Sequence, residues 1–154
     1  MNRISDFFTN PYLITGISSW FAAQVIKTVI FAIVHRKLDL SRMVGDGGMP
    51  SAHSATVTSV AVMCGLLNGT GSVEFALAFI LAIIVCHDAS GVRHETGKQA
   101  IVINELVETF RVSLDKELQE IRLKEFVGHT PLQVIAGILT GIGNALLMYA
   151  LFFS

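Results

Sequence analysis

The sequence predicts an all-α integral-membrane protein: a helical bundle of four transmembrane helices, with an amphipathic helix in the 91–130 loop. Apolar residues make up 52% of the 154 residues and charged residues only 15%, whereas about a quarter of a soluble domain is charged. Four long apolar stretches alternate with polar segments, and inside lipid a helix satisfies all of its own backbone polar groups. No linker rich in proline or glycine divides the chain, so we expect a single domain over residues 1–154.

The four apolar stretches differ in length. A hydrocarbon core about 30 Å thick requires about 20 helical residues. The first and last stretches meet this length, whereas the middle two can span only if their polar ends lie at the interface or in a protein-lined cavity. The stretches are Pro11–Val34, Ser51–Leu67, Val73–Cys86 and Pro131–Phe153.

The connections predict how the chain is oriented. Residues 68–72 form a tight turn, whereas the 35–50 and 91–130 connections are long and polar, and four crossings place both long loops on one face. Nine of the 11 Lys and Arg residues lie in these two loops. The positive-inside rule therefore predicts that this face is cytoplasmic.

The amphipathic helix is predicted from spacings of three and four residues within the last loop, with charged residues on the opposite face. In one interpretation this helix lies on the membrane surface or packs on the bundle. In the other it forms a lid over a site. Its apolar positions are Ile103, Leu106, Val107, Phe110, Leu114, Leu118 and Ile121.

Several function classes are disfavoured by composition. A formal net charge of −1 gives no support for nucleic-acid binding. Cys64 and Cys86 lie in apolar runs and are expected to be small buried hydrophobes. A zinc site built from four of the histidines has no ligand spacing to support it. We therefore expect no metal and no cofactor.

Lys27 lies deep in the first apolar stretch, and Gln24 precedes it on the same helical face. An ionisable group within a span is costly and usually faces a cavity or a partner. The alternative is that Lys27 reaches the interface along its own stem, but about eight residues separate it from the end of the stretch, roughly 12 Å at helical rise. We favour an inward-facing Lys27.

Two helix starts carry a histidine beside a proline. In GGMPSAHS (47–54) we expect Pro50 at the first helical position, with Ser51 nearby and His53 in the first turn. In GHTP (128–131) Thr130 is the expected N-cap and Pro131 the first helical residue. Free N–H groups and the helix dipole favour anions at such ends, and the predicted topology places both starts on one face.

Two histidines beside surplus cations indicate phosphoryl chemistry. Histidine can attack phosphorus or protonate a leaving oxygen, while Arg and Lys offset the charge of the phosphoryl oxygens. The sequence therefore predicts a phosphate site between the two helix starts.

These residues resemble a known superfamily. PSAH (50–53) resembles the P-S-G-H motif of type-2 phosphatidic acid phosphatases and vanadium-dependent haloperoxidases, and GHTPLQVIAG (128–137) resembles the tail of their S-R-x5-H-x3-D motif. DASGVRHETGKQA (88–100), together with GGMPSAHSA, is closer still to the divergent branch found in bacteria and plastids. The resemblance implies a membrane-bound lipid phosphate or pyrophosphate phosphatase that acts through a phosphohistidine.

The resemblance also implies roles for individual residues. His129 matches the nucleophile, His53 the proton donor, and Gln133 the position of the carboxylate that orients the nucleophile. Phosphate would be bound by Lys27, Arg42, Ser51, Arg93 and Lys98, with Gln24, Asp88 and Asn104 as accessory residues.

Three features depart from the family pattern. The arginine and the nucleophile are normally six residues apart, whereas Arg93 and His129 are 36 apart, and the usual bundle has more spans. Gln133 can accept a hydrogen bond but cannot stabilise an imidazolium by its charge, a loss that can cost orders of magnitude in rate. Either the enzyme is weak or inactive, or another carboxylate such as Asp88 serves.

Three functions stay open at this point: a lipid phosphate phosphatase, which we favour, a non-catalytic binder or transporter of phosphorylated lipid, and a structural membrane protein. Four helices are thin for enclosing a site, so we expect a homodimer. We expect the protein to lie in a bacterial inner membrane.

Overall fold

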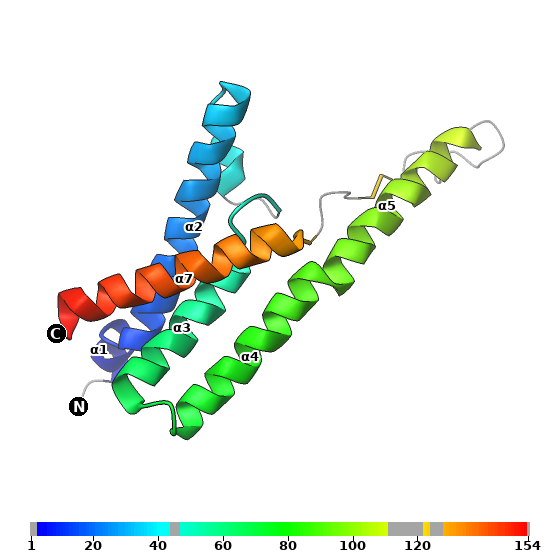
Figure 1. The fold of residues 1–154 in the computed structure, drawn as a ribbon. Helices are drawn as coiled ribbons and strands as arrows, with labels where there is room; N and C mark the ends of the chain where they lie inside the picture. Colours follow the sequence, from blue (N-terminus) through cyan, green and yellow to red (C-terminus); the bar gives the residue numbers. More distant parts are fainter. Residues whose placement is uncertain (1–2, 44–46, 111–121, 124–127, 154) are drawn as a thin grey trace.

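The computed structural model describes residues 3–43, 47–110, 122–123 and 128–153, and all regular structure in these ranges is helical (Figure 1). The elements are α1 (Arg3–Phe8), α2 (Pro11–His35), the 3-10 helix η1 (Leu40–Met43), α3 (Ala52–Asn68), α4 (Val73–Ser90), α5 (Val92–Thr109) and α7 (Pro131–Phe152). The all-α prediction is confirmed, and α2, α3, α4 and α7 match the four predicted stretches to within a few residues.

Three helical segments are long and apolar enough to cross a membrane: α2, the unit formed by α4 and α5, and α7. The second predicted stretch forms α3, which has 17 residues and is about 25 Å long at helical rise, shorter than a hydrocarbon core. The membrane location is thus supported by three helices, and a crossing by α3 stays a prediction.

Helix α3 lies at the centre and packs against α2, α4 and α7. Its crossing with α7 is close because Gly137 and Gly141 present no side chain. A Cβ on Gly137 would collide with the backbone oxygen of Ser51, and one on Gly141 with that of Ala55. Two glycines four residues apart allow such backbone contact between membrane helices, and this contact fixes the start of α7 beside the start of α3.

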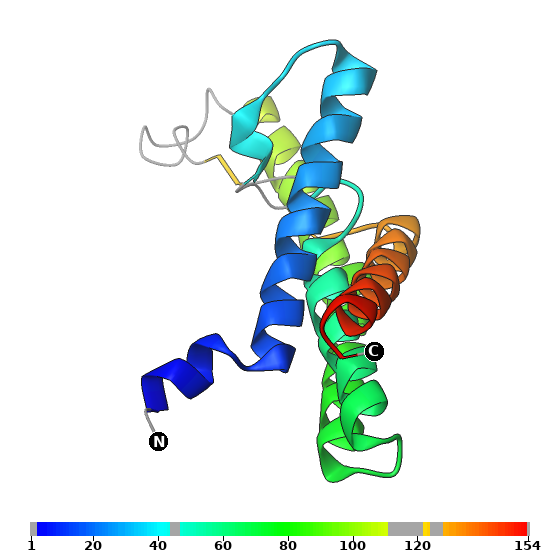
Figure 2. The same cartoon turned by 90° about the vertical axis from the view of Figure 1, so that its left-hand side faces the viewer.

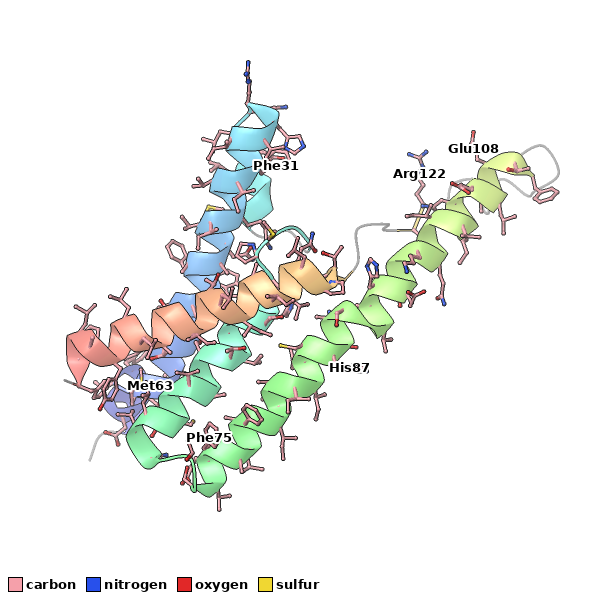
Figure 3. The ribbon with its side chains drawn as sticks, in the orientation of Figure 1. Phe31, Met63, Phe75, His87, Glu108 and Arg122 are labelled. Atoms are coloured by element: carbon pink, nitrogen blue, oxygen red, sulfur yellow. The ribbon has the colours of Figure 1, made fainter. Side chains whose placement is uncertain are left out.

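The interior of the bundle is built from small and polar side chains. Ser19 Oγ donates to the carbonyl of Ala55 at 3.1 Å, and Asn144 Nδ2 donates to the carbonyl of Thr15 at 3.2 Å. Met63 is a large, fully buried side chain in this core (Figure 3). Because lipid tails are as apolar as leucine, close packing and interhelical hydrogen bonds hold these helices together.

Helices α4 and α5 form one nearly straight arm of 37 residues with an interruption at Gly91 (Figure 1). The sequence predicts a helix within the 91–130 connection, and α5 confirms it, but α5 begins at Val92 and directly continues α4. Of the predicted amphipathic positions, Ile103, Leu106 and Val107 lie on α5 and Phe110 ends it, while the later ones fall outside the described residues. Helix α4 runs beside α3 from their shared turn, and the helical unit diverges from the bundle towards the tip of α5 (Figure 3).

The two chain ends and the turn between α3 and α4 lie towards one end of the molecule, opposite the end of α2 and the tip of α5 (Figure 2). The predicted topology, with both long connections on one side of a membrane and that side cytoplasmic, stays a prediction.

Candidate functional site

The start of α7 holds His129 by both its backbone and its ring. Thr130 is the N-cap and Pro131 the first helical residue, as predicted. Gln133 completes a capping box: its N–H donates to Thr130 Oγ1 at 3.4 Å, and its Oε1 accepts from the Thr130 N–H at 3.1 Å. The same Oε1 lies 3.3 Å from His129 Nδ1.

The contact with Gln133 favours the tautomer of His129 that carries its proton on Nδ1. Since Gln133 Oε1 is an acceptor, Nδ1 must carry the proton in the contact between them. In the neutral ring the lone pair then resides on Nε2. Gln133 thus contacts the His129 ring through a neutral acceptor.

Burial lowers the pKa of His129 from its ordinary value of 6.5, and the positive charge of Lys27 lowers it further. The hydrogen bond with Gln133 and the backbone carbonyl of Gly48 act in the opposite direction. His129 is only 4% exposed. His129 is therefore held mainly in its neutral form at neutral pH.

The start of α3 is built differently. The N-cap is Ser51 and the helix begins at Ala52, so the prediction of Pro50 at the first helical position was wrong. Ser51 Oγ accepts from the Ser54 N–H and from the Ser54 hydroxyl at 3.3 and 3.0 Å. His53 follows in the first turn, and its side chain is exposed.

The two starts converge. The Ser51 N–H donates to the Gln133 carbonyl at 3.0 Å, and the ring centroids of His53 and His129 are 6.2 Å apart. Both histidines line a cavity of about 270 Å³. Its other lining residues are Gly47, Ile84, Val85, Asp88, Ala89, Arg93 and Gly128.

The interruption at Gly91 explains how Arg93 reaches His129 across 36 residues of sequence. In an unbroken helix the Ala89 carbonyl would accept from the Arg93 N–H; here it accepts from the His129 N–H at 2.9 Å. Gly128, with a φ of 82°, packs its backbone onto the backbone of Arg93 and His94, where a Cβ would collide. The ends of the segment 94–128 therefore meet at the site.

Within the segment 94–128, residues 122–123 lie beside α5. Asn104 Nδ2 donates to the Leu123 carbonyl, and the Leu123 N–H donates to Asn104 Oδ1, both at 2.9 Å. Arg122 lies beside α5 in Figure 3. Asn104 thus fastens the returning chain to α5 and is not part of the cavity lining.

Asp88 and Arg93 form an ion pair at the rim of the cavity. Arg93 Nε donates to Asp88 Oδ2 at 2.6 Å, and the two side chains are 56% and 39% exposed. The alternative that the Asp88 carboxylate, in place of Gln133, stabilises a positive charge on His129 has no support in these contacts, because Asp88 pairs with Arg93.

Lys27 is 5% exposed, so the prediction of an inward-facing lysine is confirmed. Its stem packs against Gly48, whose φ of 84° suits glycine. Lys27 lines a neighbouring cavity of about 230 Å³, and Gly47 lines both cavities. Gln24, one turn earlier, is buried, and its Oε1 has no hydrogen-bond partner among the described residues.

Three other predicted phosphate-binding residues are placed differently. Ser51 is fully buried in its capping role and does not line the cavity. Lys98 is exposed on α5 and pairs with Glu95 at 2.7 Å. Arg42 lies in η1, and its side chain falls outside the described residues.

Sequence reasoning missed the backbone parts of the site: the Ala89 carbonyl and the close approach of Gly128. A glycine between two helical patterns, as at Gly91, is the signal that could have indicated a break there. In the described part of the chain, no three His, Cys, Asp or Glu side chains lie close enough together to hold a metal ion.

Comparison with known proteins agrees with this arrangement. Residues 8–144 match the family described as the divergent PAP2 family. The chain belongs to this family. It is also 43% identical over 147 residues to the uncharacterized membrane protein YuiD of Bacillus subtilis strain 168, covering 89% of this chain and 92% of that protein. No solved structure gives a significant match.

The matched range of the divergent PAP2 family contains both histidine-bearing helix starts and the joint between α4 and α5. This match, three apolar helices of spanning length and a relative named as a membrane protein together identify the chain as a membrane protein of the divergent PAP2 family.

Proposed function

We propose that this protein is a membrane-bound phosphatase that hydrolyses a lipid phosphate or pyrophosphate through a phosphohistidine on His129. The observation that carries the proposal is the convergence of two histidines from two helix starts, with ring centroids 6.2 Å apart, on one cavity that Arg93 also lines. In this proposal both rings contact the same small anion.

In the first step, Nε2 of neutral His129 attacks phosphorus, and the bond between phosphorus and the lipid oxygen breaks. His53 donates a proton to that oxygen, so the lipid leaves as an alcohol, or as a monophosphate if the substrate is a diphosphate. In the second step, water attacks the phosphohistidine. Neutral His53 accepts the water's proton, and inorganic phosphate leaves.

The surrounding residues stabilise charge in both steps. Arg93 offers several N–H donors to the phosphoryl oxygens. Lys27 is buried next to the cavity, and its charge influences His129, so it adds positive potential where negative charge develops. Gln133 keeps Nδ1 protonated, which leaves Nε2 as the nucleophile.

The test uses the full-length protein purified in detergent, with a prenyl diphosphate and a glycerolipid phosphate as substrates. We expect release of inorganic phosphate, and an alkaline quench with ³²P-labelled substrate should trap label on the protein. His129→Ala should abolish both signals, whereas His87→Ala, a histidine outside this cavity, should abolish neither. Turnover that persists in His129→Ala would overturn the mechanism.

A second function is favoured by one observation, the neutral Gln133 beside His129. The site would then bind phosphorylated lipid without turning it over. Gln133→Glu decides between the two: a large gain in hydrolysis supports a phosphatase limited by its missing charge, whereas retained lipid phosphate binding with no hydrolysis in either protein supports the binder.

A further inference from the structure

We propose that Asp88 is a positioning residue that holds Arg93 through Nε, so that the two terminal amino groups of the guanidinium are directed at the phosphoryl group. This inference rests on the proposed function and adds to it a second orienting pair, separate from the one that Gln133 and His129 form.

The hydrogen bond itself suggests the role. Arg93 Nε donates to Asp88 Oδ2 at 2.6 Å, and a guanidinium has five N–H donors in a fixed planar fork. Engaging Nε leaves the four N–H groups of the terminal nitrogens for phosphate oxygens, which arginine binds in a bidentate manner. Asp88 and Arg93 both line the cavity that holds His53 and His129.

Arg93 needs such support because its side chain is 56% exposed. An exposed arginine has many rotamers, and restricting them on ligand binding costs conformational entropy. A partner that restricts the side chain before the ligand arrives lowers that cost. An exposed ion pair of this kind contributes little to folding stability, so its presence at the cavity is better explained by orientation.

The break at Gly91 is what allows the pair to form. Residues five apart in an unbroken helix are about 140° apart around the axis and do not face each other. Asp88 lies in the last turn of α4 and Arg93 in the first turn of α5, with Gly91 between them at φ −102° and ψ −97°. The backbone change that exposes the Ala89 carbonyl to His129 therefore also brings Arg93 onto Asp88.

The carboxylate of Asp88 has two opposing effects on phosphate binding, and the experiment must separate them. Its charge repels a phosphate dianion, while its oxygen orients the arginine. Asp88→Asn removes the charge and keeps a carbonyl oxygen of the same shape as acceptor. Asp88→Ala removes both.

We therefore expect Asp88→Ala to raise KM for the lipid phosphate, and the Kd for orthovanadate, about tenfold, with a smaller change in kcat. Asp88→Asn should stay within about threefold of the parent protein. The matched control is Glu95→Ala, which breaks the exposed pair with Lys98 on the same arm and should change neither constant. The Tm in detergent should move little in all three variants, because exposed pairs contribute little.

A double-mutant cycle with Arg93→Ala tests whether Asp88 acts through the arginine. We expect the double variant to bind vanadate no more weakly than Arg93→Ala alone. If Asp88→Ala fails to fold, Asp88→Ser takes its place in the cycle, because serine is too short to reach Nε.

The outcomes separate the two proposals. Arg93→Ala that weakens vanadate binding, together with Asp88→Ala that leaves it unchanged or tightens it, overturns the positioning role but keeps the phosphate site. Arg93→Ala that leaves vanadate binding unchanged overturns the phosphate site itself, and with it the proposed function.

Discussion

The two histidine-bearing helix starts share a hydroxyl N-cap and a nearby proline, but they differ in almost every other respect. At the start of α7, His129 precedes the N-cap, is 4% exposed, and is held by Gln133 at the ring and by the Ala89 carbonyl at the backbone. At the start of α3, His53 follows the N-cap within the first turn and its side chain is exposed. The two histidines share one cavity.

This difference suits two different chemical tasks. A nucleophile must present one defined lone pair at one position, which a buried ring with a fixed tautomer achieves. A group that first donates and then accepts a proton must exchange protons with water, which an exposed ring achieves. We therefore propose His129 as nucleophile and His53 as acid and base, the roles that the family resemblance implies.

The role of His53 as proton donor is tested with substrates whose leaving groups differ in acidity. We expect His53→Ala to give the largest effect of the variants compared here. His53→Ala should slow hydrolysis of an alkyl lipid phosphate by about 10²–10⁴-fold, the usual contribution of a general acid. The loss should shrink for a nitrophenyl phosphate, whose leaving oxygen needs no proton. His129→Ala should be inactive towards both substrates, and equal losses for the two substrates in His53→Ala would contradict the division of roles.

Gln133→Glu places a negative charge next to the His129 ring, which contacts a neutral side chain in the parent protein. Glutamate also fits the third position of a capping box, and its charge is favourable near a helix N-terminus, so the fold should persist. We expect kcat to rise about 10- to 100-fold, because a carboxylate stabilises the imidazolium that forms during attack. Gln133→Leu is the matched control and should lower kcat; a rise in that variant would contradict the explanation.

The pH dependence follows from the environment of His129. Since burial lowers its pKa below 6.5, the neutral nucleophile persists to lower pH than for an exposed histidine, and activity should be lost as pH falls through the lowered value. Because the unfolded chain binds more protons in that range, the free energy of unfolding should also fall there. In Gln133→Glu the acidic limb should move to higher pH, which a pH profile of kcat measures.

The sequence predicted the fold class, the inward-facing Lys27 and the meeting of both helix starts, because helix periodicity, intramembrane charges and capping residues are local signals. It could not predict how Arg93 reaches His129. That contact depends on a backbone break at Gly91 and on the close approach of Gly128 to Arg93, and neither has a periodic signature. The crossing of α3, the homodimer, the lipid and the cytoplasmic face stay predictions, since they depend on the membrane or on a second chain.

Gly128→Ala tests whether the closed ends of the segment 94–128 are needed. A Cβ at this position would collide with the backbone of Arg93, and a φ of 82° is strained for alanine. We expect hydrolysis to fall about tenfold or more, because His129 and Arg93 are displaced relative to each other. Gly143→Ala, where a Cβ meets open space, is the control and should leave activity unchanged; equal effects would show that the approach of Gly128 is unimportant.

We expect the smallest effects from substitutions of the two N-cap residues, Ser51 and Thr130. Ser51→Ala and Thr130→Val each remove one N-cap hydroxyl, worth about 1 kcal/mol, so both should lower the Tm in detergent by a few degrees. Their effects on turnover should differ. Thr130→Val also loosens the capping box that holds Gln133 against His129 and should lower kcat severalfold, whereas Ser51→Ala leaves that contact intact. Equal kcat losses at equal Tm would mean that the caps act on activity only through stability, and that the greater constraint on His129 has no catalytic role.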